Sequence, residues 1–156
     1  MDFESGDAAP DFCAEASNGH LIKLTDLKGK WVILYFYPKD DTPGCTKEAC
    51  GFRYNFKRLT SHGALVFGCS RDDLKTHGKF ISKYDLPFAL LSDPDHKIAE
   101  AYGVWKEKNM YGKKIMGIER STFLINPNGE LYRIWKRVKV EGHVDEVMDE
   151  LKAVGA

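Results

Sequence analysis

Cys45 stands where a buried strand and the loop after it give way to a helix. Residues Trp31–Tyr37 are apolar throughout and rich in β-forming side chains, which is typical of a strand buried on both faces. Pro38 ends that strand, and a helical pattern of apolar residues runs from Cys45 to about His62. The unpaired N–H groups and the dipole at a helix N-terminus favour anions, so they stabilise a thiolate, the nucleophilic form of cysteine. The spacing therefore predicts that Cys45 is a reactive thiol.

The loop before Cys45 carries residues that suit such a role. Thr42 lies three residues earlier, so the loop can bring its hydroxyl beside the sulfur. Pro38 and Pro43 stiffen the loop and remove backbone donors that would compete there. In α/β proteins, sites form beyond the carboxyl ends of strands, and this loop begins at such an end.

Composition limits the class of protein. The chain has 156 residues, 43% of them apolar, which suits a single domain over residues 1–156. Lys plus Arg and Asp plus Glu both total 23, so no excess of basic charge points to nucleic acid. Residues 1–12 lack the apolar region of a secretory signal, and the longest apolar run is too short to span a bilayer. The four cysteines are too few for a disulfide scaffold, so we expect a reducing, cytoplasmic compartment and no membrane partner.

The rest of the pattern predicts an α/β domain with a mixed sheet flanked by helices. Besides the strand before Cys45, we expect short irregular strands within Ala9–Leu24, strands at Ala64–Ser70 and Phe88–Leu91, and a hairpin formed by Ser121–Ile125 and Leu131–Trp135. Beyond Cys45–His62, helices are expected from Asp72 or Asp73 to about Tyr84, from Asp93 or Asp95 to about Tyr102, and over His143–Val154. Residues Lys106–Met116 are polar and contain glycine, which indicates a surface loop.

The segment Phe36–Cys50 reads FYPKDDTPGCTKEAC and contains the pattern Pro-x-x-x-Thr-x-x-Cys. It closely resembles the active site of peroxiredoxins of the AhpC/TSA family, specifically the bacterioferritin comigratory protein (PrxQ) branch. The similarity covers nearly the whole chain, including residues 6–12, 91–94 and 119–123. The resemblance implies a thioredoxin-like fold, a single domain whose central mixed β-sheet is flanked by helices, and the activity of a thiol-specific peroxidase.

The resemblance also implies roles for individual residues. Cys45 matches the peroxidatic cysteine, and Thr42 matches the residue whose hydroxyl hydrogen-bonds the sulfur and the peroxide. Pro38 matches a proline that shields the sulfur from water. Arg120 matches the arginine that stabilises the thiolate and the transition state, and Glu48 matches an acidic position that orients this arginine.

These roles fit the chemistry of peroxide reduction. A thiolate that displaces one oxygen of a hydroperoxide develops negative charge on the leaving oxygen. Donors from Arg120, Thr42 and the start of the helix would stabilise that charge most in the transition state. Hydrogen peroxide and organic hydroperoxides would give water and alcohols, with a sulfenic acid on Cys45 and no metal or organic cofactor.

The sulfenic acid needs a second thiol. In the PrxQ branch that this sequence resembles, a cysteine at the spacing of Cys50 often supplies it. Positions five apart on a helix are separated by about 7.5 Å of rise and about 140° of rotation, whereas a disulfide needs Cα atoms within about 7 Å. We therefore expect a helical reduced state and a locally unfolded oxidised state with an intramolecular disulfide. Thioredoxin or a similar dithiol would reduce it, and a monomer is expected, although some related proteins dimerise.

Other interpretations remain open beside this one. Cys69 and Cys13 lie in predicted strands and fit structural roles. A zinc site formed by Cys45, Cys50, His62 and His77 lacks the usual ligand spacing. A thioredoxin-like disulfide oxidoreductase would carry Cys-x-x-Cys at the helix start, but position 48 is Glu. A binding or chaperone-like module would not need the thiol of Cys45 at all.

Overall fold

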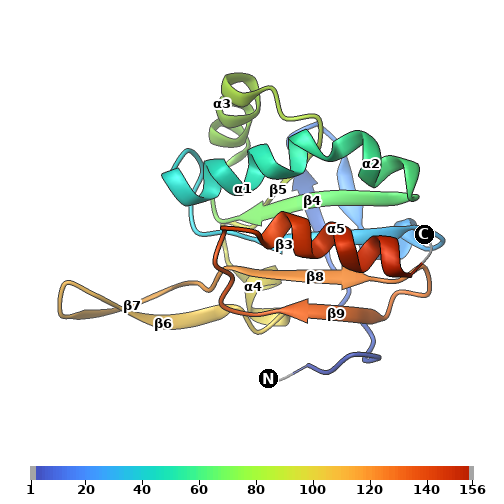
Figure 1. Cartoon of the computed structure of the whole chain (residues 1–156). Coiled ribbons are helices and arrows are strands. Elements are labelled where there is room, and N and C mark those ends of the chain that lie inside the picture. The colour runs from blue at the N-terminus through green and yellow to red at the C-terminus, as the bar shows by residue number, and fades with distance from the viewer. Residues whose placement is uncertain (1–2, 155–156) are drawn as a thin grey trace.

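A seven-stranded mixed sheet forms the centre of the computed structural model, which describes residues 3–154 (Figure 1). Its strands lie in the order β2 (Leu21–Lys23), β1 (Cys13–Ala16), β5 (Leu90–Ser92), β4 (Ala64–Ser70), β3 (Trp31–Phe36), β8 (Ser121–Ile125) and β9 (Leu131–Trp135). Strands β3, β4 and β5 are parallel, and β8 runs antiparallel to β3. The predicted α/β class with a central mixed sheet is confirmed.

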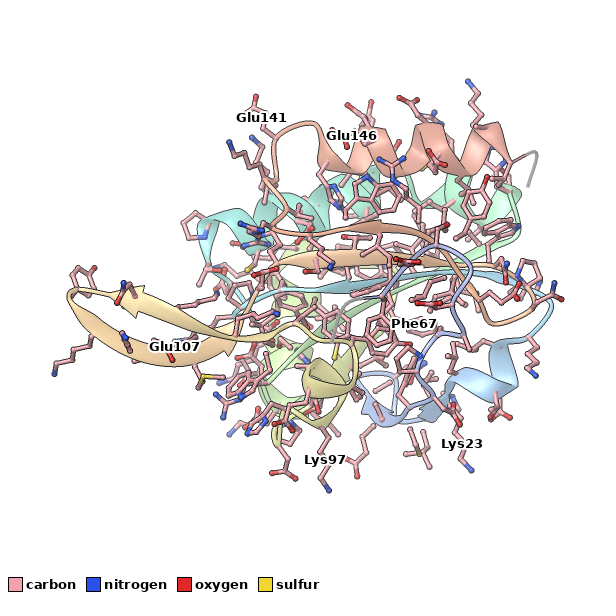
Figure 2. All side chains as sticks on the ribbon, turned by 90° about the horizontal axis from the view of Figure 1, so that it is seen from below. Lys23, Phe67, Lys97, Glu107, Glu141 and Glu146 are labelled. Carbon is pink, nitrogen blue, oxygen red and sulfur yellow. The ribbon has the colours of Figure 1, made fainter. Side chains whose placement is uncertain are left out.

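Helices cover both faces of this sheet. One face carries α1 (Pro43–Tyr54), α2 (Phe56–Ser61), α3 (Leu74–Tyr84) and α5 (His143–Ala153), and the other carries the 3-10 turn η1 (Leu24–Leu27) and α4 (Lys97–Ala101). Figure 2 shows the two layers, with Glu146 on α5 on one side of the sheet and Lys97 on α4 on the other.

The central strand β3 contributes to both cores, as its uninterrupted apolar sequence predicts. Ile33 and Tyr35 pack toward α1, whereas Leu34 and Phe36 pack toward α4, and none of these four residues is more than 1% exposed. A strand buried on both faces cannot move without disturbing two cores, so its carboxyl end is a rigid support for the loop that follows.

Several predicted elements agree closely with the structure. Strands β4, β8 and β9 have the predicted bounds, and β3 ends one residue earlier than expected. Asp73 is the N-cap of α3, because its side chain accepts a hydrogen bond from the Thr76 amide at 2.8 Å. The side chain of Asp93 accepts hydrogen bonds from the amides of Ile98 and Ala99 at the start of α4.

Other predictions were wrong in detail. The helix expected over Cys45–His62 begins at Pro43 and is interrupted at Asn55, whose side-chain amide donates to the Gly51 carbonyl at 2.9 Å. Strand β5 begins two residues later and ends one residue later than expected. Within residues 3–154, no helix is both long enough and apolar enough to cross a bilayer.

The expected surface loop Lys106–Met116 is instead a β-hairpin that projects from the body of the protein (Figure 1). It consists of β6 (Trp105–Met110) and β7 (Lys113–Ile118), joined by a turn in which Tyr111 and Gly112 both have positive φ. Most of its side chains are exposed on both faces, so the sequence lacks the apolar alternation that predicts a half-buried strand.

Candidate active site

Cys45 is the third residue of α1, after Pro43 and Gly44, and is 1% exposed. Pro43 has no N–H, and the helix has no side-chain N-cap hydrogen bond. The first intrahelical bond runs from the Thr46 amide to the Thr42 carbonyl at 2.8 Å. The amides of Gly44 and Cys45 therefore have no acceptor inside the helix and are available to an anion at this end.

Arg120 brings a permanent positive charge to the sulfur. Its Nη2 donates to Sγ of Cys45 at 3.3 Å, and its Nη1 donates to Oε1 of Glu48 at 2.7 Å. Arg120 immediately precedes β8, the strand paired with β3, so two adjacent strand ends supply the cysteine and the arginine. A Cβ at position 44 would lie 3.2 Å from Nη2, so Gly44 leaves the space in which the guanidinium sits.

Glu48 lies one turn after Cys45 on α1 and is completely buried. Burial raises the pKa of its carboxyl to about 7, although the nearby Arg120 guanidinium opposes that shift. Within residues 3–154, Oε2 of Glu48 has no hydrogen-bond partner. The structure thus joins Cys45, Arg120 and Glu48 in one hydrogen-bonded group.

Thr42 is the N-cap residue of α1, with extended backbone angles. Its hydroxyl donates to the Lys39 carbonyl at 2.8 Å, so the hydroxyl proton points to the loop backbone and the oxygen lone pairs stay available as acceptors. Pro38 follows β3, and the residue is exposed. Its shielding of the sulfur stays a prediction.

The other cysteines lie in different environments. Cys50 is half-buried on the same uninterrupted helix as Cys45, and both thiols are free. Cys69 on β4 is fully buried, and burial raises the pKa of its thiol well above the ordinary value, which keeps it protonated and unreactive. Cys13 on β1 is exposed. The zinc interpretation is not supported, because His77 bonds Asp40 and the Leu91 carbonyl instead of joining the cysteines.

Two features of this region escaped the sequence analysis. Lys108 on β6 is half-buried, and burial together with the charge of Arg120 lowers its pKa. The second is the buried pair of Asp40 and His77 beneath the loop before α1. The exposed hairpin lacks the apolar alternation that would predict its strands, and no local motif joins positions 40 and 77.

Comparison with known proteins identifies the family. The model of the AhpC/TSA family matches residues 5–134. A putative peroxiredoxin bcp of Coxiella burnetii is 54% identical over 151 residues, which is 97% of this chain and 100% of that protein. Peroxiredoxin Bcp of Bacillus subtilis is 51% identical over 152 residues, which is 97% of each chain.

Solved structures of PrxQ and bacterioferritin comigratory proteins have the same fold as this chain. A cysteine-to-serine variant of Xylella fastidiosa PrxQ superposes with a TM-score of 0.94 at 38% identity, over 100% of this chain and 99% of that chain. A Xanthomonas campestris bacterioferritin comigratory protein, studied for alkyl peroxide reduction in trapped intermediate and ligand complexes, has a TM-score of 0.89 at 43% identity, over 93% of this chain and 92% of that chain. The chain therefore belongs to the AhpC/TSA family as a peroxiredoxin of the Bcp/PrxQ type, with a thioredoxin fold and the activity of a thiol peroxidase.

Proposed function

We propose that Cys45 is the sulfur that attacks the peroxide, and the hydrogen bond from Arg120 to its Sγ is the observation that carries this proposal. The thiolate displaces the leaving oxygen of the O–O bond, and a new S–O bond forms as the O–O bond breaks. The leaving hydroxide or alkoxide takes up one proton and departs as water or an alcohol, while Cys45 becomes a sulfenic acid.

The surrounding groups divide the work of stabilising this displacement. Arg120 and the free amides at the start of α1 are donors toward the sulfur and the developing oxyanion. The hydroxyl of Thr42 donates its own proton to the Lys39 carbonyl. Its oxygen can therefore accept a hydrogen bond from the proton on the attacked peroxide oxygen. Glu48 holds the guanidinium by accepting from Nη1, and Pro38 limits the access of water to the sulfur.

We propose that Cys50 resolves the sulfenic acid. Its thiol forms the intramolecular disulfide with Cys45, and the sulfenic oxygen leaves as water. Because both residues lie on the continuous helix α1, five positions apart, the first turns of this helix must unwind before the two sulfurs can bond.

We propose that thioredoxin or a similar dithiol reduces the disulfide, and that hydrogen peroxide and organic hydroperoxides are both substrates. The alkyl peroxide activity described for the Xanthomonas campestris relative supports the organic substrates. We further propose a cytoplasmic, monomeric protein, one domain over residues 1–156, that acts without a cofactor and binds neither nucleic acid nor membrane.

A pair of assays tests the proposal. Cys45→Ser removes the thiolate while keeping nearly the same shape, so peroxide consumption in the presence of a dithiol reductant should fall to background. Cys69→Ser is the matched control and should retain activity, because that thiol is buried and protonated. Peroxidase activity that survives Cys45→Ser would contradict the proposal. Efficient insulin reduction by the wild-type protein would favour a disulfide oxidoreductase instead.

A further inference from the structure

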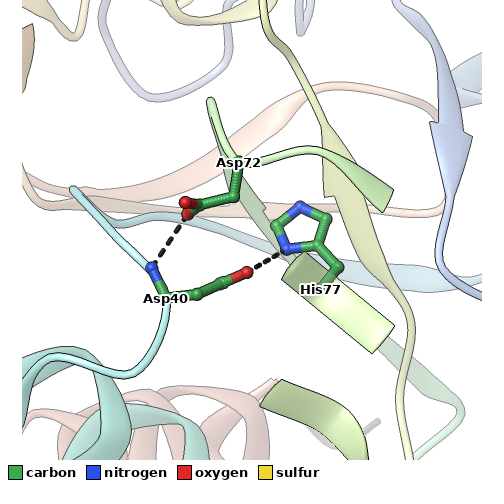
Figure 3. A group of neighbouring side chains, drawn as sticks. All are labelled: Asp40, Asp72 and His77. Atoms are coloured by element: carbon green, nitrogen blue, oxygen red, sulfur yellow. Dashed lines mark hydrogen bonds and ion pairs between the residues drawn. The ribbon is translucent and has the colours of Figure 1, made fainter. Parts of the chain in front are cut away.

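A buried polar cluster lies beneath the loop that leads to Cys45 (Figure 3). At its centre, Nδ1 of His77 on α3 is 2.6 Å from Oδ2 of Asp40, and both side chains are at most 1% exposed. The other ring nitrogen, Nε2, is 2.9 Å from the carbonyl oxygen of Leu91 on β5. His77 therefore connects the active-site loop, α3 and the sheet.

The contacts of His77 favour its protonated form. A carbonyl oxygen only accepts, so Nε2 must carry a proton, and Nδ1 also faces a hydrogen-bond acceptor, the carboxylate of Asp40. Burial lowers the pKa of His77, but the hydrogen bond and charge of Asp40, with a smaller contribution from Asp72, outweigh burial and raise the pKa. An imidazolium with two acceptors and a carboxylate is a satisfied pair, whereas removal of either partner leaves a buried group unpaired.

Asp40 is held from several directions. The hydroxyl of Tyr37 donates to its Oδ1 at 2.5 Å, and its backbone amide donates to Oδ2 of Asp72 at 2.8 Å. Asp72 in turn accepts from the hydroxyl of Ser70 at 2.6 Å. The end of β3, the end of β4 and the start of α3 thus converge on one residue of the loop.

The next residue of the loop is fixed by the same helix. Asp41 has a φ of 58°, a left-handed conformation that is unfavourable for a residue other than glycine. Its carboxylate accepts from Lys83 Nζ and from the Tyr84 hydroxyl, each at 2.8 Å. Thr42 follows directly, so two consecutive tethers to α3 determine where its hydroxyl lies.

We propose that His77 and Asp40 form a positioning pair for peroxide reduction, which fixes the loop so that Thr42 meets the peroxide while Cys45 attacks it. This role rests on the proposed functions of Cys45 and Thr42. The ligand atoms of Asp40, Asp72 and His77 lie within 4.8 Å of one another, which would also suit a metal ion. Both nitrogens of His77 already have protein partners, so the contacts favour positioning over metal binding.

Two amide substitutions separate the two contacts of His77. The side-chain nitrogen of Asn takes the place of Nδ1, so His77→Asn keeps a donor toward Asp40. The side-chain nitrogen of Gln takes the place of Nε2, so His77→Gln keeps only the donor toward Leu91. Lys79→Gln on the exposed side of the same helix is the control.

The measurement is the single-turnover rate constant for oxidation of Cys45 by hydrogen peroxide. His77→Gln should lower it about tenfold or more, because small misplacements of reacting groups are costly, and His77→Asn and Lys79→Gln should remain within about threefold of wild type. The alkylation rate of Cys45 by iodoacetamide should change little in all three, since this reaction needs the thiolate but not Thr42. Asp40→Leu, which has nearly the shape of Asp but no hydrogen-bond acceptor, should reproduce His77→Gln, and the two substitutions together should cost no more than either alone.

The outcomes distinguish this inference from the proposed function. If hydrogen peroxide does not oxidise Cys45 in the wild-type protein, the proposed function fails. If wild type reacts but folded His77→Gln and His77→Asn react equally fast, the positioning pair is wrong. Equal losses in alkylation and in peroxide oxidation would also overturn it, because they would indicate a general disturbance of the fold. Should His77→Gln not fold, folded Asp40→Leu, which also removes the contact with Nδ1, decides the question.

Discussion

The guanidinium of Arg120 lies 3.3 Å from the sulfur of Cys45, although 75 positions separate them in the chain. The contact exists because β8 pairs with β3, which brings the residue before β8 next to the helix that follows β3. The same guanidinium also holds Glu48, so its orientation is set by a buried carboxylate. The buried sulfur of Cys45 therefore has a fixed, positively charged hydrogen-bond donor beside it.

Replacing Arg120 tests the electrostatic part of this arrangement. Arg120→Met removes both donors while keeping a long apolar chain, and the rate constant for Cys45 oxidation should fall about 10²- to 10³-fold. Arg120→Lys keeps the charge but cannot donate to Cys45 and Glu48 in the same fork geometry. Its rate constant should therefore lie between those of the wild type and Arg120→Met. Stopped-flow oxidation with hydrogen peroxide measures the effect, and equal rates for all three proteins would remove Arg120 from the mechanism.

A smaller change tests the position of the guanidinium without altering its charge. Gly44→Ala would place a methyl group 3.2 Å from Nη2, so the guanidinium must shift by a few tenths of an ångström. Alanine is also a better helix former than glycine, so the fold should be no less stable. We expect slower peroxide reduction with an unchanged or higher melting temperature. Gly78→Ala on α3, where a Cβ would meet nothing within 4 Å, is the matched control.

Glu48 should couple the site to pH. Its pKa of about 7 lies above the ordinary value of 4.5, so between these pH values the folded state holds a proton that the unfolded chain has lost. The contribution of Glu48 to the free energy of unfolding therefore decreases as pH rises from 4.5 to about 7. Glu48→Gln does not titrate, and denaturant unfolding should show a shallower decrease over that range.

The same position also separates charge from hydrogen bonding. Gln keeps an oxygen that accepts from Nη1 of Arg120, whereas Ala does not. Peroxide reduction should therefore be slower in Glu48→Ala than in Glu48→Gln. The reverse order would show that Glu48 does not hold the guanidinium.

The acid side of the stability curve should depend on His143. Its Nε2 is 2.8 Å from the Thr122 hydroxyl, and burial lowers the pKa of His143 to about 4. The unfolded chain binds a proton near pH 6.5, so this residue costs stability as pH falls from about 6.5 to about 4, by at most about 3 kcal/mol. His143→Gln should reduce the difference between the unfolding free energies at about pH 7 and about pH 4.5. An unchanged difference would exclude this role.

The sequence predicted those parts of the fold whose signals are local. The uninterrupted apolar runs of β3 and β4 predicted strands buried on both faces. Asp73, a typical N-cap residue, indicated where α3 begins. At the active site, Thr42 and Cys45 were found from one short motif. Arg120 required the resemblance to a known family, because only the pairing of β8 with β3 brings it to the sulfur.

The remaining features depend on interactions that no short window contains. The hairpin β6–β7 projects from the body, so neither of its faces is patterned by a core. The pairing of His77 with Asp40 spans 37 positions and forms only when α3 packs against the sheet. At Asn55, between α1 and α2, the side-chain amide and the backbone amide both donate to the Gly51 carbonyl.

Disulfide mapping after one equivalent of hydrogen peroxide tests the central claim most directly. Trypsin should separate all four cysteines, with Cys45 in the peptide Asp40–Lys47 and Cys50 in the peptide Glu48–Arg53. The account predicts that these two peptides appear as one disulfide-linked species, which a thiol reductant splits. A disulfide from Cys45 to Cys13 or Cys69, or a Cys45 that stays a free thiol, would contradict it.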